Sequence, residues 1–468
     1  MYQVPHYIDN NKVFIVQRSE IEGRLEPEFY RPSIADLEKI IRGKSSHKLR
    51  DYALSVSGGA TPKKTEGDKY YADKETGVPF LRVQNLNTDG TLSFDDYLYI
   101  NKETHEGMLA RSQVSEGDLL VKITGVGRMA IASVAPEGFI GNTNQHMVVV
   151  KTGNKEISKY LARYLNLDII EKIASRHSTG GTRPALDYPS VKNLPIIEGI
   201  DFSPIDRAIE LKKQKESEAQ KLLDSIDAYI LNELGITLPE IKTDLKNRIF
   251  KVNRSELEER LDPTVYKDGI KLISNNYDNV KLSSVAYINP TGTFKGKDIE
   301  TPISFIPMET IDEIYSEVSK LEDTTIENAS GFTKFKEGDL LWAKITPCMQ
   351  NGKSAIAKNL TNGLGCGSTE FFVMRNKDER LAIEYLHVIL HMKCVRETAM
   401  LYFGGSAGQQ RVSSAFLENF NLPLPPKDKQ IEIANHVYTI RQKAKALQEE
   451  GKVLLEEAKR KVESMIIG

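Results

Sequence analysis

The chain has 468 residues, of which 40% are hydrophobic and 27% are charged, and its formal net charge is −2. These values fit a globular protein of two to four domains, and no apolar run approaches the ~20 residues that a membrane-spanning helix needs. With this net charge the chain as a whole is not a strongly basic DNA-binding protein. A large protein can still carry a local basic groove. Three cysteines without zinc-ligand spacing, and an N-terminus without a signal-peptide pattern, predict a cytoplasmic protein.

A fifteen-residue segment near the N-terminus returns in the second half of the chain. Val16–Tyr30 and Val252–Tyr266 are identical at nine of fifteen positions. Three shorter matches follow in the same order: residues 116–124 with 337–346, Gly180-Gly181 with Gly404-Gly405, and Asn193-Leu194-Pro195 with Asn421-Leu422-Pro423. Each copy then ends in a long helical pattern. The order predicts two copies of one globular unit, related by a near two-fold symmetry within one chain.

The first globular unit is expected to span residues 1–200. Short β-type runs at 80–83, 118–123 and 147–150 are broken by Gly, Asn and Asp, as in strands with tight turns. Helical spacing of apolar residues occurs at 33–41 and 158–175. This pattern predicts a mixed α/β unit with largely antiparallel strands.

A helical spacer is expected over residues 201–248. Ser203-Pro204 has the sequence of a helix start, and the pattern continues to about Leu234 and stops at Gly235. Such a helix would be ~45 Å long at 1.5 Å per residue. Its apolar stripe includes Ile205, Ile209, Leu222 and Ile226.

The second globular unit is expected at 249–427, with strands at 339–345 and 371–374, and a final helical spacer at 428–468. Apolar residues of the final helix follow the alternating four-three spacing of a coiled coil, and then shift by one place after Ala458 to Val462, Met465 and Ile466. The predicted seam includes Val437, Ile440, Leu447 and Leu454. Gly451 on this seam predicts a close approach of a second helix.

The two long helices are predicted to pair with each other. Each helix follows its own unit, so an antiparallel pair would hold the units at opposite ends of a rod. The alternative is that each helix packs only on its own domain. The predicted fold class is α+β, with two tandem pseudo-two-fold-related mixed α/β domains joined by two long helices that form an antiparallel coiled coil.

No catalytic pattern is persuasive, and we predict neither catalytic residues nor a metal site. The chain lacks a phosphate-binding P-loop and a Gly-x-Ser-x-Gly elbow. His387 and His391 lie four residues apart on a predicted helix, with Glu384 and Cys394 nearby, but without the His-Glu-x-x-His order of zinc proteases. A structural helix is the more economical interpretation of this segment.

Three pairs of matched polar loops have the composition of DNA-contacting loops, with basic groups for phosphates and amides for base edges. Ordinary hairpins, surface loops and solvated lysines are the alternative interpretations. The candidate contacts in the first unit are Lys63, Lys64, Arg82, Lys122, Thr124, Arg128, Asn142, Thr143, Asn144, Gln145, Thr179 and Arg183. Those in the second unit are Lys295, Lys297, Lys344, Thr346, Gln350, Asn351, Lys353, Ser368, Thr369, Gln409, Gln410 and Arg411.

Over nearly its whole length the chain resembles the specificity subunits of type I restriction-modification systems. The resemblance rests on the ordered duplication, on Gly117-Asp118-Leu119-Leu120 with Gly338-Asp339-Leu340-Leu341, on residues 344–353, and on 367–371. The helix starts of that family are Gln-rich, and here only Lys429-Gln430-Ile431 matches them.

The resemblance implies a non-catalytic DNA-recognition subunit. Each unit would be a target-recognition domain for one half of a bipartite site in double-stranded DNA, and the helices would set the spacer. Two methyltransferase subunits would dock on the helices and bring S-adenosylmethionine, and restriction subunits would bring ATP and Mg. This chain itself would bind no cofactor and no membrane.

Other functions stay open at this point. A recognition subunit of a type IIB-like enzyme, which cuts on both sides of a bipartite site, would have the same fold and a different partner. A coiled-coil protein-interaction adaptor would show no salt-sensitive DNA affinity. An enzyme with an unrecognised site would use His387 and His391. A homodimer through the exposed helix stripes is possible for the isolated chain.

Overall fold

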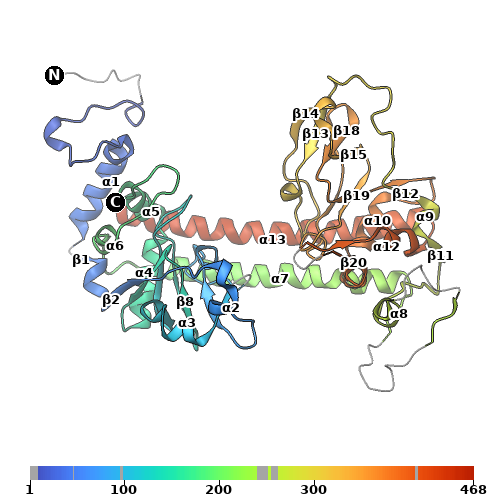
Figure 1. Cartoon of the computed structure of the whole chain (residues 1–468). Coiled ribbons are helices and arrows are strands. Elements are labelled where there is room, and N and C mark those ends of the chain that lie inside the picture. Colours follow the sequence, from blue (N-terminus) through green and yellow to red (C-terminus); the bar gives the residue numbers. More distant parts are fainter. Residues whose placement is uncertain (1–8, 46, 95–97, 240–250, 255–261, 406–408) are drawn as a thin grey trace. The chain divides into compact units, whose positions relative to one another are not determined.

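The computed structural model describes residues 9–45, 47–94, 98–239, 251–254, 262–405 and 409–468. The chain forms two compact units (Figure 1). Unit 1 contains residues 1–214 and 450–468, and unit 2 contains residues 215–449. Each unit therefore includes a part of both long helices. The sequence had instead predicted the helices as separate spacers, with boundaries at residues 200, 248 and 427.

Unit 1 is built on two four-stranded sheets. The first has the order β2-β9-β6-β7 and is entirely antiparallel, and the second has the order β4-β3-β8-β5 with one parallel pair, β3 and β8. The strands are β1 (His47–Lys48), β2 (Ser55–Gly58), β3 (Val78–Leu81), β4 (Leu98–Ile100), β5 (Gln113–Ser115), β6 (Leu119–Lys122), β7 (Ala132–Val134), β8 (Ile140–Thr143), β9 (Met147–Lys151) and β10 (Pro195–Ile196). The short pair β1-β10 completes the strands.

The helices of unit 1 are α1 (Pro32–Lys44), α2 (Gly67–Tyr70), α3 (Lys102–Glu106), α4 (Lys155–Leu165), α5 (Asp168–Arg176), α6 (Tyr188–Lys192) and the first turns of α7 (Ser203–Glu233). All of them except α2 and α3 contribute residues to the core under the first sheet. The largest core of this unit joins alternate residues of β6 and β9 to the apolar faces of α4 and α5. The predicted mixed α/β unit with largely antiparallel strands is confirmed.

Unit 2 repeats the strand order of unit 1. Its sheets are β12-β19-β16-β17 and β14-β13-β18-β15, again with one parallel pair, β13 and β18. The strands are β11 (Asp278–Lys281), β12 (Ala286–Ile288), β13 (Pro302–Ile306), β14 (Glu322–Thr325), β15 (Thr333–Lys336), β16 (Leu340–Ala343), β17 (Ser354–Ile356), β18 (Leu364–Gly367), β19 (Phe371–Asn376), β20 (Phe403–Gly404), β21 (Arg411–Val412) and β22 (Asn421–Leu424). The duplication seen in the sequence is thus a duplication of topology.

The helices of unit 2 follow the first copy in part. They are α8 (Pro263–Asp268), α9 (Leu282–Val285), α10 (Ile383–His391), α11 (Lys393–Met400), α12 (Ser414–Asn419), the last turns of α7 and the first turns of α13 (Lys427–Ile467). Of these, α10, α11 and α12 occur at the places in the chain order where unit 1 has α4, α5 and α6. Residues 255–261, which carry much of the second copy of the fifteen-residue motif, lie outside the described residues.

The Gly-Asp-Leu-Leu motif has the same structural role in both units. Gly117 and Gly338 have positive φ angles of 79° and 83°, a conformation that glycine adopts without strain. Asp118 accepts a hydrogen bond from Ser115 N at 2.8 Å and an ion pair from Lys151, and Asp339 is bonded likewise by Lys336 N and by Arg375. The motif therefore shapes the turn into a central strand and is no DNA contact.

One predicted helix, at 158–175, is two helices. The amide of Asn166 donates to the carbonyl oxygen of Ala132 at 2.6 Å and accepts from the nitrogen of Ala132 at 3.2 Å. Asn166 is only 2% exposed, and it ends α4 two residues before α5 begins. A buried side-chain amide that bonds a neighbouring strand has displaced the continuous helix that periodicity predicted.

The two long helices lie side by side within each unit, in opposite directions. In unit 2, Lys429 Nζ lies 2.5 Å from a carboxylate oxygen of Glu233, and the rings of Tyr229 and His436 stack at 4.1 Å. In unit 1, a Cβ at Gly451 would lie 3.3 Å from the Cα of Lys212. The predicted antiparallel pairing and the close approach at Gly451 are confirmed.

The predicted seam is buried at five of its eight positions, and the other three are half-buried. The buried positions are Ile205, Ile209, Ile226, Val437 and Ile440, and the half-buried ones are Leu222, Leu447 and Leu454. The shift in the α13 stripe comes earlier than predicted, because Leu455 is buried at 3% exposure, and Met465 is 61% exposed. In this part of α13 the apolar stripe joins the core of unit 1.

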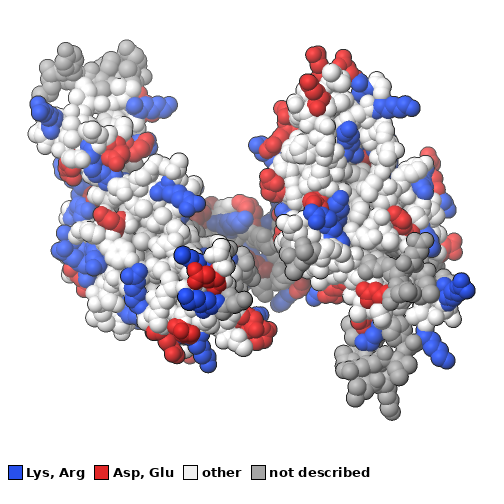
Figure 2. All heavy atoms as spheres, viewed as in Figure 1, with Lys and Arg blue, Asp and Glu red and all other residues white. Residues whose placement is uncertain are grey.

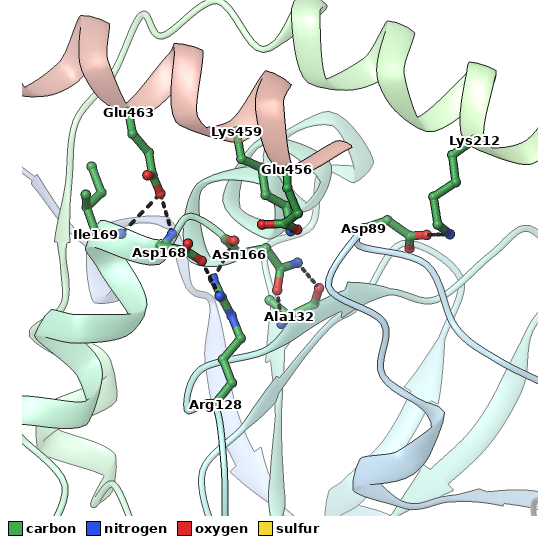
Figure 3. Close-up of polar contacts among 10 residues, drawn as sticks. All are labelled: Asp89, Arg128, Ala132, Asn166, Asp168, Ile169, Lys212, Glu456, Lys459 and Glu463. Carbon is green, nitrogen blue, oxygen red and sulfur yellow. Dashed lines mark hydrogen bonds and ion pairs between the residues drawn. The ribbon is translucent and has the colours of Figure 1, made fainter. Parts of the chain in front are cut away.

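The end of α13 caps helix α5. Helix α5 has no side-chain cap of its own, and an Oε of Glu463 accepts hydrogen bonds from the first two backbone N–H groups, those of Asp168 and Ile169 (Figure 3). Unpaired N–H groups at a helix start carry partial positive charge, so a carboxylate satisfies them well. Burial raises the pKa of Glu463, although these backbone hydrogen bonds oppose the effect.

We expect Glu463→Ala to lower the stability of α5 by about 1–2 kcal/mol, because two buried N–H groups lose their acceptor. Glu463→Gln keeps an acceptor oxygen and removes a charge that burial penalises, so its cost should be much smaller. Hydrogen exchange of the α5 amides measures both. Glu457→Ala, at an exposed position of α13, is the control, and equal costs for the Ala and Gln variants at residue 463 would contradict the cap.

Candidate nucleic-acid interface

Three loops of unit 1 that are far apart in sequence meet at one end of strand β6. We name residues 122–128, 143–146 and 177–186 loop cluster 1. Ile123 N donates to His146 O at 2.9 Å, Gly125 N to Pro184 O at 3.0 Å, and Leu186 N to Ile123 O at 2.8 Å. Backbone hydrogen bonds therefore hold the three loops together, as the matched sequence segments suggested.

Unit 2 holds the corresponding loops by the same bonds. Loop cluster 2 is defined as residues 344–353, 367–371, 404–405 and 409–412, since 406–408 lie outside the described residues. Lys344 N donates to Glu370 O at 2.9 Å, Thr346 N to Gln410 O at 3.0 Å, and Val412 N to Lys344 O at 2.9 Å. One backbone scaffold thus presents two different sets of side chains.

This bonding corrects the residue-by-residue match made from sequence. Lys344 occupies the backbone position of Ile123, so the match of Lys122 with Lys344 is wrong by one residue. A shift of one residue along a strand reverses the face on which a side chain lies. Lys122 accordingly lies in the interior at 4% exposure, whereas Lys344 is half-buried with its Nζ 5.6 Å from the ring centroid of Phe372.

Arg183 and Arg411 do not occupy equivalent backbone positions. Arg411 occupies the backbone position of Ala185, because Val412 and Leu186 make equivalent bonds to their strands. Arg183 is exposed and has neither a hydrogen bond nor an ion pair within the described residues. Arg411 lies on Glu370, with its Nε and Nη2 at 2.9 and 2.7 Å from the two carboxylate oxygens.

Burial argues against four candidate contacts in unit 1. The Nζ of Lys122 donates to Val126 O at 2.8 Å, and burial lowers its pKa. Asn142 is fully buried and donates to Leu109 O at 2.8 Å. Thr143 is also fully buried, and Asn144 is 7% exposed and accepts from His146 N. The burial of these four side chains argues against direct contact with DNA.

Arg128 is likewise a structural residue. One nitrogen of its guanidinium pairs with Asp168 and another donates to Asn166 O at 2.6 Å (Figure 3). The pair ties the end of loop 122–128 to the start of α5, the helix that Glu463 caps. In unit 2, Lys353 is similarly engaged, with Nζ 3.2 Å from Met308 O, and the hydroxyl of Thr346 is buried.

The other candidates keep their status as predicted contacts. Exposed side chains of the two clusters are Gln145, Thr179, Arg183, Asn351, Thr369, Gln409 and Arg411, and half-buried ones are Thr124, Lys344, Gln350, Ser368 and Gln410. Outside the clusters, Lys63, Lys295 and Lys297 are exposed and Arg82 is half-buried. The side chain of Lys64 lies outside the described residues.

A buried carboxylate that sequence patterns did not reveal holds loop 177–186. Glu38 is 3% exposed and receives Arg42 Nε at 2.7 Å, Arg176 Nη1 at 2.5 Å and His177 Nε2 at 2.8 Å. Burial alone would raise the pKa of Glu38, but the hydrogen bonds and charges of His177, Arg176 and Arg42 lower it to about 2. Glu38 is thus ionised at neutral pH at the base of this loop.

The first copy of the fifteen-residue motif, Val16–Tyr30, also contacts this loop and the residue before it. Arg24 donates to Ser178 O at 2.8 Å, and Arg176 Nε donates to Phe29 O at 2.6 Å. The guanidinium carbons of Arg24 and Arg176 lie 4.5 and 4.4 Å from the centroid of the Phe29 ring, at cation–π distance. The sequence predicted a helix at 33–41, but no pattern in it singled out Glu38.

Charge is mixed over the surface. On the visible face of each unit, basic and acidic side chains alternate without a wide area of one sign (Figure 2). This agrees with the net charge of −2. Any DNA contact would thus depend on particular loop residues more than on a broad electrostatic field.

The two histidines of α10 are part of the fold. His387 Nε2 lies 3.0 Å from Ser354 Oγ, and His391 Nε2 lies 3.1 Å from Glu313 O. Burial lowers the pKa of His387 to about 3 and that of His391 well below its usual value. Within the described residues, no three His, Cys, Asp or Glu side chains form a metal-binding group.

Part of the chain matches a known protein family. Residues 274–456 match the family model of the type I restriction modification DNA specificity domain. This part of the chain is therefore similar to the DNA specificity domain of type I restriction-modification systems. The resemblance seen in the sequence, and the predicted fold class, are therefore confirmed.

Two curated relatives come from Escherichia coli. The specificity subunit of the type I restriction enzyme EcoEI is 36% identical over 164 residues, which are 34% of this chain and 27% of the relative. That of EcoAI is 34% identical over 183 residues, which are 38% of this chain and 29% of the relative. The matches thus span less than a third of these relatives' own length.

A solved chain from work on complex assembly and conformational transition of the type I R-M system also matches. It has 16% sequence identity and a TM-score of 0.44, over 90% of this chain and 95% of that chain. None of the described helices is long and apolar enough to cross a membrane.

Proposed function

We propose that the chain is a non-catalytic, sequence-specific DNA-recognition subunit of a type I restriction-modification complex. Each unit would bind one half of a bipartite site in double-stranded DNA through its loop cluster. The match of residues 274–456 to the type I DNA specificity domain supports this function. Three free cysteines fit a role in the cytoplasm.

The observation that carries the proposal is the pair of loop clusters. Equivalent backbone positions hold Ile123 and Lys344, His146 and Glu370, and Ala185 and Arg411. A repeated scaffold with different side chains at the same positions has the chemistry to bind two different half-sites. Lysine and arginine suit guanine or phosphate, whereas a carboxylate suits the amino group of cytosine.

We further propose that the paired helices set the distance between half-sites and dock two methyltransferase subunits. Helix α7 has 31 residues and α13 has 41, so at 1.5 Å per residue they would be roughly 46 and 62 Å long. The partners would supply S-adenosylmethionine for methylation, and restriction subunits would supply ATP and Mg chemistry.

The proposal is tested by mapping methylated adenines. The chain is expressed together with the methyltransferase subunit of its system in a host that lacks both, and modified bases are read genome-wide by single-molecule sequencing. One split motif with a fixed gap is expected. An assembled, active complex that methylates no split motif would overturn the proposal.

We expect Arg183→Ala to weaken binding to the mapped site by about 1–3 kcal/mol, and binding to random DNA by less, because an exposed arginine without a partner is available for a base edge. A loss on the mapped site is also expected for Arg411→Ala, but for a different reason: Arg411 is held on Glu370, so its removal also leaves that carboxylate without its partner. Fluorescence anisotropy on cognate and scrambled duplexes, at one salt concentration, measures both. Equal losses on the two duplexes would assign these arginines to phosphate contact.

A further inference from the structure

Unit 2 contains a cleft that the DNA-recognition function does not use. It lies between α10, the first turns of α13 and the loop 312–321, and has a volume of about 650 Å³. Its apolar wall includes Val318, Leu321, Ile356 and Val388. This volume and lining are those of a site for a small organic molecule.

A buried arginine lines this cleft. Arg441 of α13 is 6% exposed, and among the described residues its Nε has no hydrogen-bond partner. Three carboxylates lie near enough to act on its charge, those of Asp227, Asp312 and Glu317. Each has other hydrogen-bond donors: Glu317 accepts from Lys445 Nζ at 2.6 Å and Gln442 Nε2 at 2.8 Å, Asp227 from Lys393 N at 2.8 Å, and Asp312 from Ile314 N at 2.8 Å. A guanidinium in the interior is costly unless an anion or acceptor satisfies it.

Two hydroxyl groups beside Arg441 show the same deficiency. The Tyr315 hydroxyl and the Ser316 hydroxyl are buried, and within the described chain neither has a partner. Ser316 also has a φ angle of 58°, which is uncommon for a residue with a side chain. Unpaired buried polar atoms are rare in folded proteins, and the three residues that carry these atoms all line one cleft.

We propose that this cleft binds a carboxylate attached to an apolar group, with Arg441 as the main partner of the carboxylate. The apolar wall would receive the body of the ligand. Such a group occurs both in a free organic acid and at the C-terminus of a partner polypeptide that ends in an apolar residue. Arginine recognises a carboxylate through two parallel N–H bonds, so the acid is preferred to its uncharged analogue.

The test titrates octanoate, with 1-octanol as the uncharged analogue, into the full-length chain by isothermal calorimetry. We expect saturable one-to-one binding of octanoate that weakens at least tenfold in Arg441→Gln. Arg460→Gln, an exposed arginine of the same helix, should leave the affinity unchanged. Absence of saturable octanoate binding, or equal affinity for 1-octanol, would overturn the proposal.

If Arg441→Gln does not fold, a second variant still tests whether octanoate binds in the cleft. Val318→Trp fills the cleft and leaves Arg441 in place, so it should abolish octanoate binding while circular dichroism stays that of the native chain. Undiminished octanoate binding in a folded Val318→Trp chain would show that octanoate binds elsewhere, and the cleft would lose its assignment.

The complex distinguishes the two sources of the carboxylate. Octanoate binding that persists after assembly with the methyltransferase subunit identifies a free acid as the ligand. Octanoate binding that disappears on assembly, and returns when the C-terminal residues of the partner are removed, identifies the partner. Only the experiment on the assembled complex rests on the proposed function. If the chain proves not to recognise DNA, the octanoate titration of the isolated chain is still a valid test of the cleft.

Discussion

Glu38→Gln is expected to destabilise unit 1 by on the order of 3 kcal/mol at pH 7 and to weaken cognate DNA binding. Glu38 is almost fully buried and bonds three basic side chains. Its loss leaves Arg176 and His177 without their carboxylate, and removal of one member of a buried ion cluster is strongly destabilising. Because Arg176 directly precedes loop 177–186 and His177 is its first residue, that loop should lose its fixed position.

The destabilisation should depend on pH in a definite direction. The pKa of Glu38 is about 2 in the folded chain, against an ordinary value of 4.5. A lowered carboxyl pKa contributes stability above the ordinary value, and this contribution is lost as the pH falls from about 4.5 towards 2. The stability difference between the native chain and Glu38→Gln should therefore shrink over that range.

Hydrogen-exchange mass spectrometry on α5 peptides measures this effect, because it reports on unit 1 alone in a chain with two units. Glu28→Gln is the control, since Glu28 lies in the same N-terminal region with its side chain 70% exposed. It should change the stability by less than about 0.5 kcal/mol. A Glu38 effect that stays constant from pH 7 to pH 3 would show that packing, and not charge, is responsible.

Removal of four residues from each long helix is expected to change the preferred DNA spacer. Deletion of residues 215–218 from α7 and 446–449 from α13 would shorten each helix by ~6 Å. DNA rises 3.4 Å per base pair, so we expect a spacer shorter by about one to two base pairs. Methylation mapping of the complex with the shortened chain reads the new gap directly.

Two matched chains control for damage to the helices. Replacement of the other seven of these residues by alanine, since Ala446 is already alanine, keeps the length and should keep the spacer. Deletion from α7 alone removes the match between the paired helices and should abolish methylation. An unchanged spacer in an active chain with both deletions would refute the role of the helices as a ruler.

The sequence predicted most of the fold because its signals were local or repeated. Ser203-Pro204 and Gly235 mark the bounds of α7, and the alternating pattern around Val437 and Ile440 predicted the helix pair. The ordered matches predicted the duplicated topology. These features depend on short-range preferences or on simple periodicity, which a single sequence contains.

The loop residues were harder to predict because their roles depend on contacts between distant segments. Lys122 and Lys344 look equivalent in the sequence, yet the backbone bonds shift them by one place and bury only the first. Asn142 has a side chain that could contact a base, but in the structure it donates a hydrogen bond to the buried carbonyl group of Leu109. Neither composition nor spacing shows which side of a strand a polar residue occupies.

The assembly of unit 1 from both ends of the chain has a consequence for synthesis. Lys44 of α1 donates to Ile466 O at 2.6 Å, and 422 positions separate the two residues. On the ribosome, residues 450–468 emerge only after all of unit 2. Until these residues have been synthesised, Ile205 and Ile209 lack two residues of their hydrophobic core, Leu455 and Val462. The core of unit 1 is therefore incomplete while unit 2 is being synthesised. Contacts at such long separation form slowly, and this interval exposes the nascent chain to aggregation and to chaperones.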